Sequence, residues 1–208
     1  MSTNPVSVRA IGRHAVREEL ARIAFNQFCA TGFDQVTFAD LAGATGVSRS
    51  TFLRYFANKE DVVLFVFDPI GDIVVDALAS VHALHDDWLA LRRAFDPVLS
   101  FLARDADEVI AFLNLIEATP ALRAKFREKQ FGWRPNITRE LLRREQVSVE
   151  RSIIADVRVA TAMECFSTAL IYWRDANGQQ DLSGLLDLAF GALSDPGASA
   201  GPPDSSQY

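Results

Sequence analysis

Apolar residues recur along this chain at the three- and four-residue spacing of α-helices, and strand-like alternation is weak. The first helical pattern covers about Val16–Thr31, with Leu20, Ala24 and Phe28 on one face. Gly32 follows at the position where glycine commonly ends a helix. The pattern therefore predicts an all-α fold.

Residues 36–63 predict three short helices joined by tight turns. Thr37 is a suitable N-cap, with Asp40 three residues later as in a capping box. Gly46 permits the positive φ of a tight turn, and Ser48 caps the helix that follows. A helix-turn-helix uses this order to present its second helix to the DNA major groove.

The apolar run Val62–Phe67 predicts a buried connector helix, which Pro69 and Gly71 are expected to kink or end. Pro97 and Pro135 are expected to interrupt two later helices. The later helical patterns cover residues 73–84, 87–104, 106–117, 120–147, 150–175 and 182–193.

These patterns divide the chain into four segments. We expect a flexible N-terminal arm over 1–15 and a helix-turn-helix DNA-binding domain over 16–61. A larger helical domain over 62–193 would bind a ligand and dimerise. The small, polar, proline- and glycine-rich tail over 194–208 is expected to be disordered.

Composition narrows the class of protein. The 208 residues are 49% hydrophobic, which is enough for a packed core. There is no apolar run of membrane-spanning length and no signal-peptide core, so we expect a cytoplasmic protein with no membrane partner. Cys29 and Cys165 lie in apolar helical patterns and are expected to be buried, reduced thiols.

The net charge of −6 is unevenly distributed. Residues 1–61 hold seven basic and six acidic side chains, a balance of +1, whereas residues 62–208 hold fourteen and twenty-one, a balance of −7. Because phosphate neutralisation drives nucleic-acid affinity, any DNA contact must be local and come from the N-terminal third.

The helix after Gly46 carries the candidate DNA contacts. Phe52 and Phe56 can anchor it, which leaves its opposite face exposed. Arginine can bind guanine in bidentate fashion, and Lys59 at a helix start can hold a phosphate. The expected DNA-binding residues are Thr37, Ser48, Arg49, Ser50, Thr51, Leu53, Arg54, Tyr55 and Lys59. On spacing alone, a three-helix cap with solvated arginines is the alternative.

Residues 16–63 resemble the N-terminal domain of the tetracycline-repressor (TetR) family of bacterial transcriptional regulators. The matching positions are Phe28, Gly32-Phe33, Thr37, Leu41-Ala42, Gly46-Val47-Ser48, Thr51-Phe52, Arg54-Tyr55-Phe56 and Lys59-Glu60-Asp61. The resemblance implies a dimeric repressor whose effector binds in the C-terminal domain. By position it implies DNA contacts for Thr37, Arg49, Ser50, Thr51, Tyr55 and Lys59.

Three positions leave the set of DNA contacts open. The family often has an aromatic residue where this chain has Leu53, and leucine cannot donate a hydrogen bond to phosphate. It could contact a thymine methyl group instead. Arg9 and Arg13 could reach a minor groove from the N-terminal arm, or have no role.

The second half of the chain is rich in aromatic residues, which predicts an apolar cavity for a small hydrophobic effector. Ordinary core packing is the alternative. Asn114, Glu117 and Arg134 are the polar residues best placed to orient a ligand, with solvated or capping roles as the alternative for each. The full expected lining is Phe65, Phe101, Phe112, Asn114, Ile116, Glu117, Trp133, Arg134, Met163 and Phe166. The sequence suggests no cofactor.

The last two helical patterns predict a homodimer interface. Apolar residues repeat at helical spacing in both, and a second apolar face needs a partner to cover it. The expected interface residues are Ala162, Phe166, Ala169, Leu170, Trp173, Leu182, Leu185, Leu186, Ala189 and Leu193. The alternative is burial of both faces within one chain.

Enzyme signatures are weak. His82 and His85 share a helix face, but no further metal ligands lie at a recognisable spacing, and no nucleophile or phosphate-loop motif is present. Together with the helix-turn-helix pattern, this favours a sequence-specific DNA-binding regulator. The resemblance to the TetR family implies a repressor, which we expect a small apolar effector to release from double-stranded operator DNA. A helical sensor or interaction protein without DNA binding is the alternative, and an enzyme using the cavity is a third.

Overall fold

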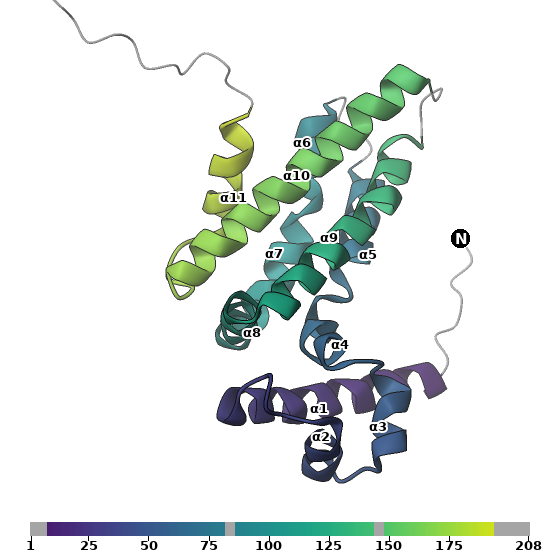
Figure 1. Ribbon diagram of the computed structural model, residues 1–208. Helices are drawn as coiled ribbons and strands as arrows, with labels where there is room; N and C mark the ends of the chain where they lie inside the picture. The colour runs from purple at the N-terminus through teal and green to yellow at the C-terminus, as the bar shows by residue number, and fades with distance from the viewer. Residues whose placement is uncertain (1–7, 82–85, 144–147, 194–208) are drawn as a thin grey trace, which may run out of the picture. The chain divides into compact units, whose positions relative to one another are not determined.

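The computed structural model describes residues 8–81, 86–143 and 148–193, and within these ranges the chain folds into helices with no β-strand (Figure 1). The α-helices are α1 (Val8–Thr31), α2 (Phe38–Thr45), α3 (Arg49–Tyr55), α4 (Lys59–Leu64), α5 (Ile70–Ser80), α6 (Asp87–Ala94), α7 (Asp96–Leu102), α8 (Ala106–Ala118), α9 (Pro120–Leu141), α10 (Val149–Asp175) and α11 (Leu182–Gly191). Two 3₁₀ turns, η1 (Phe65–Phe67) and η2 (Ala103–Asp105), follow α4 and α7. The all-α class is thus confirmed.

The chain divides into two compact units, each made of two stretches of sequence. The first combines Met1–Asp72 with Asp105–Trp133, and the second combines Ile73–Arg104 with Arg134–Tyr208. This division differs from the expected boundary after residue 61. In the first unit, Phe25 of α1 packs against Phe112 of α8, with ring centroids 3.8 Å apart, a pairing that local periodicity cannot reveal.

Helix α1 begins at Val8, eight residues earlier than expected, so residues 8–15 of the expected arm are helical. Residues 1–7 of that arm and the tail after residue 193 lie outside the described residues. Gly32 ends α1 with a φ of +94°, and its N–H donates to the Phe28 carbonyl at 2.9 Å. Glycine reaches this left-handed conformation without steric cost.

The expected connector is buried, with Val63 and Phe67 fully so, but it is not one continuous helix. Helix α4 passes into η1, and α5 starts directly after Pro69. Pro97 lies in the first turn of α7 and separates it from α6, as predicted. The prediction for Pro135 was wrong, because α9 continues through it. The buried Ile137 beyond the proline holds the helix in place, which offsets the loss of one hydrogen bond.

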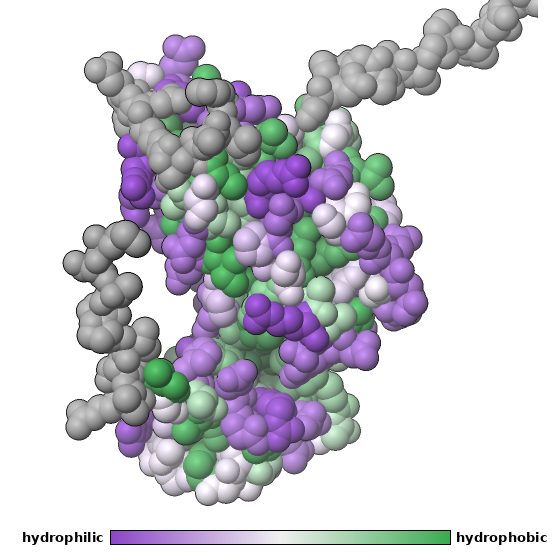
Figure 2. All heavy atoms as spheres, turned by 180° about the vertical axis from the view of Figure 1, so that it is seen from behind, coloured by the Kyte–Doolittle hydropathy of each residue, from purple (hydrophilic) through white to green (hydrophobic). Residues whose placement is uncertain are grey.

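The second unit has its own aromatic core. Phe95 stacks on Phe166 with centroids 4.9 Å apart, and Trp88 packs against Phe190 of α11 at 4.4 Å. Arg92 of α6 is buried and donates to Asp187 of α11 at 2.6 Å. The surface is mixed, and Figure 2 shows hydrophilic and hydrophobic residues interspersed over one face.

Candidate nucleic-acid interface

Helix α3 is fixed to the first unit by aromatic side chains on one of its faces. Phe52 and Phe56 are 0% and 1% exposed, and their ring centroids are 5.6 Å apart. Phe38 of α2 meets Phe52 edge-on at 6.0 Å. The opposite face of this seven-residue helix is therefore held in a defined orientation.

The other face of α3 is the polar surface expected from the sequence. Arg49, Ser50, Leu53 and Arg54 are exposed, and Tyr55 is half-buried. These side chains are thus wholly or partly accessible on a helix that Phe52 and Phe56 anchor. The proposed role of each in DNA binding stays a prediction.

Ser48 fulfils its expected role as the N-cap of α3. Its Oγ accepts a hydrogen bond from the Thr51 backbone N–H at 3.1 Å. The same oxygen lies 3.0 Å from Ser50 Oγ and 2.9 Å from Thr51 Oγ1. The hydroxyl groups of Ser48, Ser50 and Thr51 thus form one hydrogen-bonded cluster at the start of the helix.

Thr37 caps α2 through a reciprocal pair of bonds with Asp40. Thr37 Oγ1 donates to Asp40 Oδ2 at 2.7 Å and accepts from the Asp40 N–H at 3.3 Å, while the Thr37 N–H donates to Oδ2 at 2.8 Å. The bonds from the Thr37 hydroxyl and backbone lower the pKa of the Asp40 carboxyl. The hydroxyl proton of Thr37 is thus engaged within the protein, and its oxygen remains as an acceptor.

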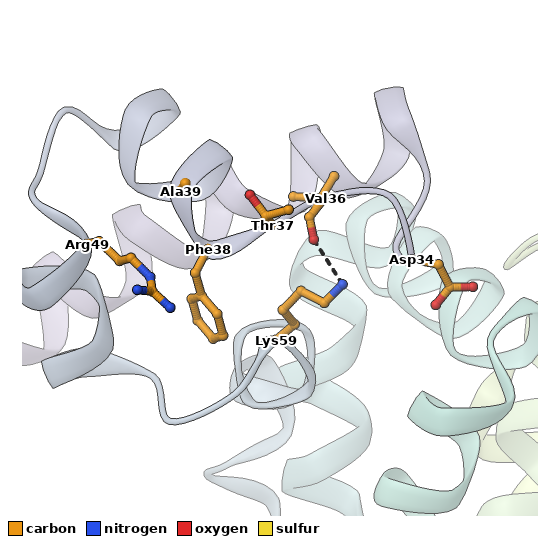
Figure 3. A pocket seen from close by; sticks show the side chains of 7 residues that line it. All are labelled: Asp34, Val36, Thr37, Phe38, Ala39, Arg49 and Lys59. Carbon is orange, nitrogen blue, oxygen red and sulfur yellow. Dashed lines mark hydrogen bonds between the residues drawn. The ribbon is translucent and has the colours of Figure 1, made fainter.

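Lys59 lies at the start of α4 and reaches back to the loop between α1 and α2. Its Nζ donates to the carbonyl oxygens of Phe33 at 2.8 Å and Val36 at 2.9 Å, and lies 4.7 Å from the centre of the Phe33 ring. In Figure 3 the side chains of Arg49 and Lys59 flank the Phe38 ring. The hollow drawn there, about 470 Å³, is also lined by Asp34, Val36, Thr37 and Ala39.

A second hollow, of about 590 Å³, lies between α1 and α3. Its lining consists of Gly12, Arg13, Val16, Arg54 and Tyr55. Arg13 thus belongs to a helix rather than to a flexible arm, and it lines the same hollow as the basic end of α3. The side chain of Arg9 lies outside what the structure describes.

The expected ligand-pocket residues are divided between the two units. Phe65, Phe112, Asn114, Ile116, Glu117 and Trp133 belong to the first, and Phe101, Arg134, Met163 and Phe166 to the second. Within the first unit Glu117 pairs with Arg123 at 3.1 Å, and Asn114 is exposed. The contacts of Phe112 with Phe25 and of Phe166 with Phe95 are also those of core packing. A ligand pocket stays a prediction.

Most of the expected dimer residues are buried within the single chain. The buried ones are Ala162, Phe166, Ala169, Leu170, Trp173, Leu182 and Leu186. Leu185 and Ala189 are half-buried, and Leu193 is exposed. The exposed apolar residues at this end of the chain are Ile171, Tyr172, Leu188 and Leu193. Helical spacing identified the apolar faces of α10 and α11 but not which face the chain itself covers.

The remaining predictions concern the cysteines, the histidines, metal sites and membrane spans. Cys165 is buried as expected, and its burial raises the pKa of the thiol. Cys29, near the end of α1, is exposed, contrary to the expectation, and the partial desolvation of its thiol raises the pKa. His82 and His85 lie outside the described residues. Within residues 8–81, 86–143 and 148–193, no three acidic, histidine or cysteine side chains are grouped to hold a metal ion. No helix of the described part combines the length and hydrophobicity that a membrane span requires.

Comparison with known sequences identifies a matching protein family and similar regulators. The model of the family described as "Bacterial regulatory proteins, tetR family" matches residues 22–66. The transcriptional regulator TcmR of Streptomyces glaucescens is 29% identical over 140 residues, 64% of this chain and 62% of its own length. The regulator MftR of Mycobacterium tuberculosis is 31% identical over 139 residues, 64% of this chain and 67% of its own length. The chain thus spans less than two thirds of TcmR.

Solved structures share the fold. FadR of Thermus thermophilus, in complex with lauroyl-CoA, has a TM-score of 0.55 at 20% identity, covering 92% of this chain and all of that one. The fatty acid degradation regulator FadR of Bacillus halodurans has a TM-score of 0.55 at 18% identity, covering 89% of this chain and 97% of that one.

The relatives are transcriptional regulators rather than enzymes, which confirms the prediction of a non-enzymatic protein. The matched residues 22–66 contain the capped α2, the glycine turn and the anchored α3 described above. From this match and the identity with MftR, the chain belongs to the TetR family of bacterial transcriptional regulators.

Proposed function

We propose that this regulator is a homodimeric repressor that binds operator DNA through α3 and is released by a small apolar effector. The observation that carries the proposal is the anchoring of α3, which we term the recognition helix. Phe52 is fully buried, while Arg49 and Arg54 are exposed. Arginine side chains on a rigid short helix can read guanine edges in the major groove.

The charge distribution supports DNA contact by the N-terminal part of the chain. Residues 1–61 have a balance of +1 against −7 for the remainder. Binding therefore depends on a few local cations, including Arg13 and Arg54 at the second hollow. A protein with few phosphate contacts has a modest salt dependence, because each contact releases about one counterion.

A homodimer would place one recognition helix in each of two half-sites. Their centres would lie about 34–36 Å apart, or a multiple of one helical turn. The exposed Leu188 and Tyr172 support a partner surface on α10 and α11, since large apolar side chains gain from being covered.

The effector is proposed to act in the helices beyond residue 62. Thermus thermophilus FadR, which has the same fold, is described in complex with lauroyl-CoA, so this compound is the first probe. An effector can weaken operator binding only if it prefers one conformation, and couplings of about 1–3 kcal/mol are typical.

Fluorescence anisotropy with a labelled duplex from upstream of its own gene tests the proposal. A shuffled duplex of the same composition is the control, and both are titrated at about 0.1 M salt. We expect affinity for the natural sequence at least ~10³-fold higher than for the shuffled one. Equal affinities at every moderate salt concentration would refute operator binding. A bound lipid in native mass spectrometry, together with no DNA binding, would instead favour a sensor.

A further inference from the structure

A group of charged side chains in the first unit joins α9 to α1. Asp68, directly after η1, forms ion pairs with Lys129 of α9 and with Arg17 of α1. In the second pair, Asp68 Oδ2 lies 3.2 Å from Arg17 Nη1. The side chains of Arg17, Asp68 and Lys129 are 32%, 34% and 24% exposed. Partial burial reduces screening by salt, so these pairs are stronger than fully exposed ones.

Arg17 connects this charged group to the recognition helix through two aromatic rings. Its guanidinium carbon lies 4.5 Å from the centre of the Phe65 ring and 5.0 Å from that of Phe56. The two rings meet edge-on at 6.0 Å. Phe56 is the C-cap of α3, and its N–H donates to the Phe52 carbonyl at 3.1 Å. Contacts thus run without a break from α9 to the last turn of α3.

We propose that Asp68 is a positioning residue that couples the placement of α9 to that of the recognition helix. Lys129 fixes the Asp68 carboxylate, and the carboxylate fixes the Arg17 guanidinium against Phe56. Without the carboxylate, two cations would face one another uncompensated. The inference rests on the proposed function, because it supplies a route by which a change in α9 would alter DNA affinity.

A double-mutant cycle of Lys129→Gln and Asp68→Asn tests this coupling. Amide hydrogen exchange of residues 49–56 is measured in the DNA-free protein, relative to exchange in α10, and operator affinity is measured alongside. Lys129→Gln should raise the relative exchange of α3 about two- to five-fold and weaken operator binding by a similar factor. In the Asp68→Asn background it should cause no further increase in exchange, because the carboxylate through which Lys129 acts is gone and its removal also relieves repulsion with Arg17. Arg127→Gln, an exposed change of the same charge on the same helix, should alter neither.

An unchanged α3-to-α10 ratio in Lys129→Gln would overturn the inference, since lost stability alone raises exchange in both helices. An undiminished effect in the Asp68→Asn background would also overturn it. If Asp68→Asn does not fold, Lys129→Arg is compared with Lys129→Gln instead. Because arginine keeps the positive charge, Lys129→Arg should show the wild-type ratio of α3 exchange to α10 exchange, and a ratio equal to that of Lys129→Gln refutes the coupling. The exchange measurement needs no DNA. If the ratio responds as expected while the wild-type protein binds no operator, the coupling stands and the proposed function fails.

Discussion

The ammonium group of Lys59 donates a hydrogen bond to the carbonyl oxygen of Val36, with 2.9 Å between Nζ and O. Val36 directly precedes Thr37, the N-cap of α2, so the start of α4 is tied to the start of α2. A second bond, to the Phe33 carbonyl, fixes the other end of the same loop. Lys59 therefore has a role inside the protein that its position at a helix start did not suggest.

Replacing Lys59 by methionine should lower the free energy of unfolding by about 1–2 kcal/mol, because the carbonyl groups of two buried residues, Phe33 and Val36, lose a charged donor. Thermal unfolding without DNA measures this. Lys125→Met, on an exposed pair with Glu128 of α9, is the control and should change stability little. Unchanged stability of Lys59→Met with weakened operator binding would assign Lys59 to a phosphate contact alone.

The local elements could be predicted from the sequence because their signals are local. Thr37 and Ser48 each accept a hydrogen bond from a backbone N–H three residues later, as their positions indicated. The anchoring of α3 by Phe52 and Phe56 follows from their four-residue spacing in the same way.

Contacts between distant segments could not be predicted. Periodicity identifies the apolar face of a helix but not the segment that covers it. Lys59 reaches a carbonyl 23 residues earlier, and Asp68 pairs with Lys129 61 residues later. The same limit explains the dimer prediction, since Leu186 and Leu188 of α11 are 0% and 73% exposed although only one residue separates them.

Arg49→Ala should weaken operator binding about ten-fold or more, because the exposed guanidinium is the candidate for a bidentate contact with guanine. Helical content should not change, since the side chain is exposed. Anisotropy and circular dichroism measure the two quantities. Arg104→Ala, at an exposed arginine of η2, is the matched control. Equal affinities of Arg49→Ala and wild type would remove Arg49 from the contact set.

The Asp40 carboxyl should titrate at a lower pH in the wild-type protein than in Thr37→Val. The hydroxyl bond from Thr37 stabilises the ionised form and lowers the pKa, and valine cannot donate it. Because the folded pKa is depressed, the stability that Asp40 contributes is fully present above the ordinary value of about 3.9. It is lost as the pH falls through the folded value. An NMR titration of Asp40 gives both midpoints, and coincident midpoints would contradict the capping assignment.

Gly71→Ala should destabilise the protein by about 1 kcal/mol. A Cβ at this position would lie 2.5 Å from Trp133 Cδ1 and 2.9 Å from Cγ, which outweighs the better helix propensity of alanine. The glycine is thus needed for close packing and not for a kink. Gly43→Ala in α2, with no atom within 4 Å of its Cβ, should be neutral or stabilising. In a Trp133→Leu background the cost of Gly71→Ala should disappear, and a persistent cost would locate its origin elsewhere.

Leu188→Arg should dissociate the proposed homodimer and leave the chain folded. Leu188 is 73% exposed on α11, so arginine fits a single chain but would bury an unpaired charge against a partner. We expect the dimer dissociation constant to rise at least ~10-fold, as measured by analytical ultracentrifugation with circular dichroism on the same samples. Leu89→Arg, at a 41% exposed leucine of α6, is the matched control and should leave the dimer intact. Leu186→Arg should unfold the chain instead, because Leu186 is fully buried. A Leu188→Arg protein that dimerises as tightly as wild type would exclude this face of α11 from the interface.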